Sequence, residues 1–68
     1  MKISARNQLS GTVTSVNEGA AIANVEIDVN GQRLVASITV EAVRELGLKE
    51  GAAVTAIVKA SDVLLATD

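Results

Sequence analysis

The chain has 68 residues, a formal net charge of −2 and an apolar fraction of 49%, yet it contains no aromatic residue, cysteine or histidine. This composition predicts a single small domain over residues 1–68 and excludes disulfides, thiolate metal sites and imidazole ligands. Small domains without such supports usually associate, and this much aliphatic surface exceeds what one small core can bury. We therefore expect a homo-oligomer.

Acidic and basic residues are interspersed along the chain, so no basic patch points to nucleic acid or to an anionic membrane. No apolar run approaches the roughly 18 residues of a membrane span. The start, MKISARN, lacks the apolar region and the cleavage pattern of a secretory signal. We expect a cytoplasmic protein with neither a nucleic-acid nor a membrane partner.

Three strands are predicted in the first half of the chain. LSGTVTSV indicates the first strand, which ends at the turn Asn17-Glu18-Gly19. Residues 20–29 alternate between apolar and polar, and Asn30-Gly31 then predicts a type I′ hairpin turn that leads into the return strand QRLVASIT. The apolar faces of these two strands are expected to comprise Ala21, Ala23, Val25, Ile27 and Val29, and then Leu34, Ala36 and Ile38.

One short helix is predicted in TVEAVRELGLKEG. Thr39 is a candidate N-cap, Gly47 lies just past the end, and the apolar positions recur at three-residue spacing. These positions are Val40, Val43 and Leu46. VTAIVKA predicts a fourth strand with apolar residues on both faces, and DVLLA predicts a short fifth strand.

The predicted order is three strands, a short helix and two strands. This order is typical of an all-β fold, a small OB-like five-stranded Greek-key barrel with one short helix between strands 3 and 4. A generic small β-sandwich is the alternative architecture.

Catalytic signatures are absent from the sequence. It has no histidine, no cysteine, no G-x-S-x-G and no P-loop spacing, and no pair of carboxylates is expected in an apolar pocket. An enzymatic role would rest on Lys59 alone. We expect neither catalytic residues, nor a metal-ligand cluster, nor a cofactor.

Hydrogen-bond donors occur in three places. Ser4 and Arg6 lie near the N-terminus, Lys59-Ala60-Ser61 lies near the other end, and Thr39 precedes the amides that open the helix. Such groups can surround an oxyanion. Each of these residues also has a plainer alternative role. Lys59 can be a solvated lysine at a strand edge, and Arg6 can be a surface ion-pair partner. Thr39 can serve only as a helix cap, and Ser61-Asp62 can form only a turn.

Three segments resemble the molbindins, a family of small molybdate-binding proteins: ISARNQLSGTV, ASITVEAVRELGLKEG and TAIVKASDVLLA. The resemblance covers essentially the whole chain. It implies an OB-like barrel that assembles with strand exchange into a hexamer, a trimer of dimers, and holds oxyanions between subunits. The residues it implies for the molybdate sites are Ser4, Ala5, Arg6, Ser37, Thr39, Val40, Glu41, Ala42, Lys59, Ala60 and Ser61.

One position departs from the family pattern. Relatives often carry a serine where this chain has Ala42, so a hydroxyl is missing at the helix start and only the backbone N–H remains. The resemblance predicts intracellular storage of molybdate, with tungstate as a further ligand. The alternatives are an oligomerisation or ligand-sensing domain of a regulator or transporter, and a nucleic-acid-binding OB module. The start at Met1-Lys2 favours a free-standing protein.

Overall fold

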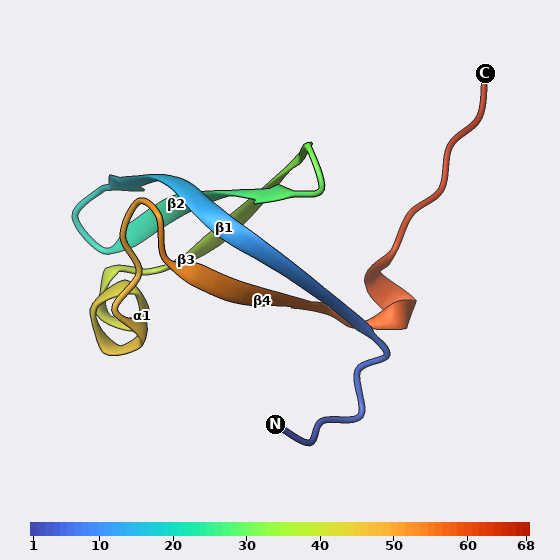
Figure 1. Ribbon diagram of the computed structural model, residues 1–68, viewed down its shortest axis with the longest axis horizontal. Helices are drawn as coiled ribbons and strands as arrows, with labels where there is room; N and C mark the ends of the chain where they lie inside the picture. The colour runs from blue at the N-terminus through green and yellow to red at the C-terminus, as the bar shows by residue number, and fades with distance from the viewer.

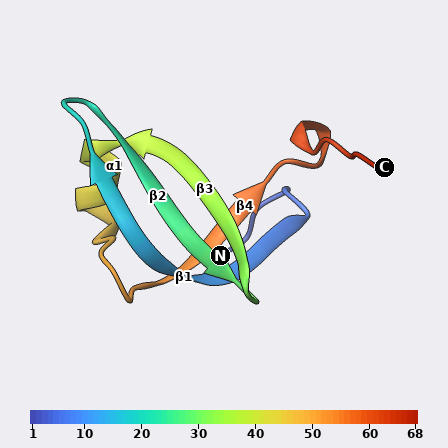
Figure 2. The same cartoon turned by 90° about the horizontal axis from the view of Figure 1, so that it is seen from above.

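A computed structural model of the protein describes all residues from 1 to 68. The elements follow in the order β1 (Asn7–Glu18), β2 (Ile22–Val29), β3 (Gln32–Thr39), α1 (Val40–Leu46), β4 (Ala53–Val58) and the 3₁₀ turn η1 (Ala60–Asp62) (Figure 1). The strands form one antiparallel sheet in the order β3-β2-β1-β4. α1 lies at one end of this sheet, and η1 with the C-terminal segment lies at the other (Figure 2). No helix is both long and apolar enough to span a membrane.

The expectation of a five-stranded barrel is wrong for the last strand. DVLLA forms no strand: η1 ends at Asp62, and the residues after it run away from the sheet (Figure 1). Leu64 and Leu65 are 93% and 92% exposed. A strand needs a neighbouring edge to pair its backbone, and this segment lies against none. The sheet therefore stays open, and β3 and β4 are its two edges.

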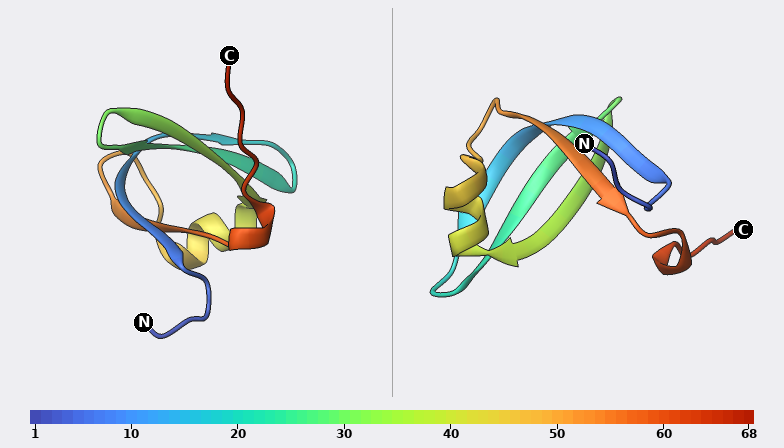
Figure 3. Two further views of the ribbon diagram at one scale, coloured as in Figure 1. Left: turned by 90° about the vertical axis from the view of Figure 1, so that its right-hand side faces the viewer. Right: turned by 90° about the horizontal axis from the view of Figure 1, so that it is seen from below.

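The sheet is strongly curved (Figure 3). Its two edge strands line an apolar groove of about 430 Å³. We call it the seam groove. Its 14 lining residues come mainly from 34–38 on β3 and 54–58 on β4, and 12 of them are hydrophobic. The open side of the sheet thus exposes apolar surface that a closed barrel would bury.

The core lies between the concave face of the sheet and α1. Its buried residues are Val13, Ala23, Val25, Ile27, Val40 and Val43. The predicted alternation in β2 and β3 is confirmed, with Leu34, Ala36 and Ile38 half-buried. Two positions differ from the prediction. Ala21 precedes β2 and is exposed, and Leu46, in the last turn of α1, is 67% exposed and borders the seam groove instead of entering the core.

The turn predicted at Asn17-Glu18-Gly19 lies later than expected, because Asn17 and Glu18 continue β1 and pair with Asn24 and Ala23 of β2. The other two local predictions, the hairpin turn and the helix caps, are confirmed. Asn30 and Gly31 both have positive φ, 50° and 84°, as a type I′ hairpin requires. Thr39 caps α1, because its Oγ1 accepts a 3.0 Å hydrogen bond from the N–H of Ala42. Gly47 ends the helix in the left-handed conformation, with φ 64°.

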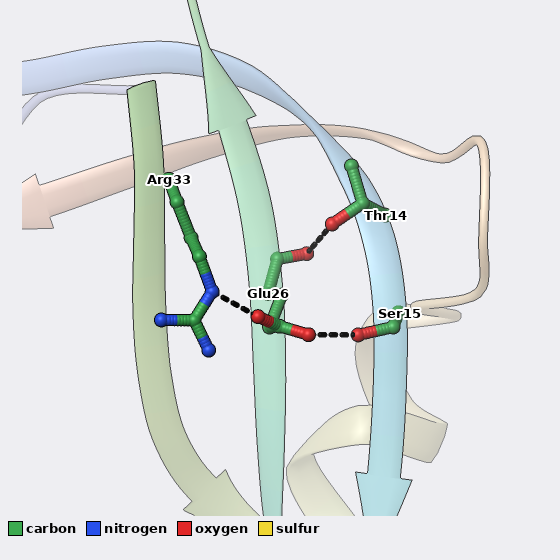
Figure 4. Close-up of polar contacts among 4 residues, drawn as sticks. All are labelled: Thr14, Ser15, Glu26 and Arg33. Atoms are coloured by element: carbon green, nitrogen blue, oxygen red, sulfur yellow. Dashed lines mark hydrogen bonds and ion pairs between the residues drawn. The ribbon is translucent and has the colours of Figure 1, made fainter. Parts of the chain in front are cut away.

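A polar network crosses the convex side of three strands at Glu26 (Figure 4). Ser15 Oγ donates a 2.6 Å hydrogen bond to one carboxylate oxygen, and Arg33 Nε donates to the other. Thr14 Oγ1 donates to the Glu26 carbonyl at 3.2 Å. The register of β1 shifts between Val13 and Ser15, so this network holds the two strands together at an irregular point of the ladder.

These contacts predict a pH-dependent effect of Glu26→Gln. The hydrogen bond from Ser15, followed by Arg33, lowers the pKa of Glu26 below its ordinary 4.5. A lowered folded-state pKa adds stability above pH 4.5, and that stability is lost as the pH falls through the lowered value. We therefore expect the Glu26→Gln variant to have a lower Tm than the wild type at pH 7. At pH 3 the two Tm values should be nearly equal, as measured by circular dichroism.

The control for this experiment is Glu50→Gln, because Glu50 is exposed and forms neither an ion pair nor a side-chain hydrogen bond. Its Tm should match the wild type at both pH values. An equal Tm difference between Glu26→Gln and the wild type at pH 7 and pH 3 would contradict the role of the Glu26 charge.

Candidate functional site

Antiparallel pairing of β1 with β4 brings the residues just before β1 close to the residues just after β4. The ladder runs from Thr12↔Ala53 to Asn7↔Val58. The residues just beyond its last pair, 4–6 on one side and 59–62 on the other, line a hollow of about 630 Å³. We call it the chain-end hollow. Six of the residues predicted for the molybdate sites lie here: Ser4, Ala5, Arg6, Lys59, Ala60 and Ser61.

The cations of the chain-end hollow are free to meet an anion. Arg6 and Lys59 are exposed, and neither forms an ion pair, because the two salt bridges of the chain are Arg33–Glu26 and Arg44–Glu18. No side-chain hydrogen bond within the chain uses Ser4, Arg6 or Lys59. The hollow therefore presents two positive charges and a hydroxyl without internal partners.

Backbone donors add to this set. Asp62 N–H donates to the Lys59 carbonyl at 2.9 Å and closes the η1 turn, so the amides of Ala60 and Ser61 lie in its unpaired first positions. No side chain caps them. Charged donors, a hydroxyl and free amides together form a surface that suits an acceptor such as an oxyanion.

Three lining residues were not predicted from the sequence: Ile3, Ile57 and Asp62. Ile57 reaches the hollow from β4, where it pairs with Gln8, and this register was not evident from composition. Asp62 is the one acidic residue among those that line the hollow. The available signal was its position directly after Ser61, where the sequence indicated only a turn.

The helix start lies in a different place. Thr39, Val40 and Glu41 line a second hollow of about 580 Å³, together with Arg44 and other residues. Two of the amides expected to remain free are already engaged: Val40 N–H donates to the Ala21 carbonyl at 2.9 Å, and Ala42 N–H donates to Thr39 Oγ1. The helix start therefore offers fewer free donors within one chain than the sequence indicated.

The last two predicted residues lie in neither hollow. Ser37 is exposed on the edge strand β3 and borders the seam groove. Ala42 is half-buried on α1. Within one chain the eleven predicted residues thus occupy separate places, and only the Ser4–Arg6 and Lys59–Ser61 segments come together.

The chain is thus a small, open, curved β-sheet with a donor-lined hollow beside the ends of β1 and β4. The family model for the TOBE domain matches residues 3–65, so the chain belongs to the TOBE family and, within it, to the Mop-type proteins. It is 44% identical over 66 residues to molybdenum-pterin-binding protein 2 of Clostridium pasteurianum, covering 96% of this chain and 97% of that protein. The resemblance to the molbindins is confirmed.

Solved structures agree with the fold. A molybdate-binding protein from Sporomusa ovata superposes with a TM-score of 0.94 at 42% identity, covering 98% of this chain and all of that one. The cytoplasmic molybdate-binding protein ModG, in a form with molybdate bound, gives a TM-score of 0.90 at 45% identity, covering 94% of this chain and 46% of ModG. The family is one of molybdate-binding proteins, not an enzyme family.

Proposed function

We propose that this protein binds molybdate, and tungstate as well, in the chain-end hollow and serves in its storage or homeostasis in the cytoplasm. The observation that carries this proposal is the convergence of Arg6 and Lys59, without internal partners, beside Ser4 and the free amides of η1. The relatives supply the identity of the anion, since the Sporomusa protein and ModG are molybdate-binding proteins.

The donor set suits this anion chemically. Molybdate at neutral pH is fully deprotonated and only accepts hydrogen bonds. The cations and backbone amides of the hollow donate only, and its hydroxyls can donate as well, so all of these groups can bond to the anion. Sulfate is also an acceptor without a proton to donate. Discrimination against it therefore rests on the size of the completed site, and tungstate, which is nearly the size of molybdate, should bind in the same way.

The site is completed, in this proposal, when chains assemble into a homo-oligomer, a hexamer built as a trimer of dimers. This proposal is supported by two apolar surfaces that a single chain leaves exposed. One is the seam groove between β3 and β4, and the other is the C-terminal tail with Leu64 and Leu65. A neighbouring chain that exchanges its tail would cover both. The same assembly would bring the helix start, with Ser37 and residues 39–42, against the hollow of another chain.

Ligand binding and assembly should then be linked. An anion that binds only the assembled form stabilises it by RT ln(1 + [L]/Kd) per site, about 2.7 kcal/mol at a hundredfold excess over Kd. We therefore expect molybdate to raise the Tm and to suppress dissociation on dilution. Native mass spectrometry with and without molybdate should show a hexamer and an integral number of bound anions.

Perchlorate at equal ionic strength is the control, because screening of like charges would act for any salt. It is a monoanion and should leave the Tm and the subunit count nearly unchanged. Equal stabilisation by both anions would contradict a molybdate site. Full-affinity molybdate binding by a monomeric variant would contradict its location between subunits.

A further inference from the structure

We infer that Asp62 weakens the binding of dianions in the chain-end hollow, so that the ligand is held reversibly. This inference rests on the proposed function and assigns a role to the one acidic residue that lines the hollow. A protein that stores an anion must also release it. A fixed negative charge beside the donors is a direct physical means to that end.

The position of Asp62 is set by the η1 turn. Its N–H donates to the Lys59 carbonyl at 2.9 Å, which fixes its backbone three residues after the lysine of the site. Its side chain is exposed and takes part in no hydrogen bond or ion pair of the chain. Within one chain, therefore, no paired cation neutralises its charge.

The charge balance of the hollow shows what this carboxylate changes. Arg6 and Lys59 contribute +1 each and Asp62 contributes −1, so the lining carries a net +1 instead of +2. A hollow of about 630 Å³ places any bound anion within about one Debye length, ~8 Å at physiological salt, of its lining charges. The repulsion between the carboxylate and a dianion is then only partly screened.

Hydrogen bonding cannot offset this repulsion. An ionised carboxylate only accepts hydrogen bonds, and molybdate also only accepts them, so the two groups have no favourable contact. Removing the charge while keeping the shape of the side chain should strengthen binding. This direction is the opposite of that expected for a residue that ligates the anion.

The test is calorimetric titration of Asp62→Asn with molybdate at 0.15 M salt. We expect the affinity to rise about three- to tenfold over the wild type, as Coulomb repulsion at these distances in high dielectric predicts. The gain should shrink at 0.5 M salt, where screening is stronger. Asp62→Glu keeps the charge and should bind within twofold of the wild type.

Asp28→Asn is the matched control, since it changes the net charge equally but lies elsewhere. Asp28 pairs with Thr12 of β1, five positions from Asn7, which is about 16 Å along a strand. It should leave the affinity nearly unchanged. Melting curves of all variants verify folding.

The outcomes are distinct. Unchanged or weaker binding by Asp62→Asn, with a wild type that binds molybdate, would overturn the inference and leave the proposed function standing. An equal gain in Asp28→Asn would overturn it too, since net charge alone would then explain the effect. No molybdate binding by the wild type would overturn the proposed function and this inference with it.

Discussion

Lys59→Met is expected to weaken molybdate binding by about 1.5–3 kcal/mol, a loss of roughly tenfold to 150-fold in affinity. The substitution keeps most of the length of the side chain but removes the only lysine of the chain-end hollow. The lost interaction is a charge-assisted hydrogen bond to a dianion, which is stronger than one between neutral groups. Isothermal titration calorimetry measures the change directly.

The fold and the assembly should survive this substitution. Lys59 lies just after β4, is exposed, and forms no ion pair within the chain, so its side chain contributes little to the stability of the monomer. Sedimentation should therefore give the same subunit count for the variant and the wild type.

Lys49→Met is the matched control, because Lys49 is an exposed lysine in the loop between α1 and β4 and lies outside the chain-end hollow. Its molybdate affinity should equal that of the wild type. If Lys59→Met also binds with wild-type affinity, Lys59 is a solvated edge lysine and does not contact the anion.

Gly11→Ala is expected to lower the free energy of unfolding by about 1–3 kcal/mol, as measured by urea denaturation at fixed protein concentration. A Cβ atom at position 11 would lie 2.6 Å from the carbonyl oxygen of Asp28 and 2.7 Å from Cγ2 of Ile27. The oxygen belongs to the backbone of β2 and can move only if the strand moves. The close approach of the two strands therefore requires glycine.

Ser10→Ala tests whether the strand tolerates alanine in general. Ser10 is the neighbour of Gly11 on β1, is exposed, and its side chain makes no hydrogen bond. This substitution should change stability by no more than about 0.5 kcal/mol. Equal stability of Gly11→Ala and the wild type would mean that β1 can shift away from β2 without cost.

The elements that depend on neighbouring residues were predictable from the sequence. The hairpin at Asn30-Gly31 and the helix from Thr39 to Gly47 follow from turn and capping chemistry within a few positions. The tail was not predictable in this way. DVLLA has the composition of a strand, but a strand forms only when it pairs with another edge, and this segment leads away from both free edges of the sheet, β3 and β4 (Figure 1).

The site shows the same division between local and long-range information. Ser4, Arg6 and Lys59 were recognised as donors from their residue types, and the resemblance supplied molybdate as their ligand. The β1–β4 ladder places the three residues in one hollow. The engagement of the Val40 amide by the Ala21 carbonyl depends on a contact between distant segments. No spacing rule could have revealed it.

The pairing of Asn7 with Val58 joins positions 51 residues apart, which makes it one of the longest-range contacts of the sheet. On the ribosome, the β2–β3 hairpin can close soon after it emerges, whereas this pair must wait until nearly the whole chain has left the exit tunnel. The chain-end hollow therefore forms after the β2–β3 hairpin. A chain that stops before residue 59 lacks one wall of the chain-end hollow, and with it Lys59 and the amides of η1.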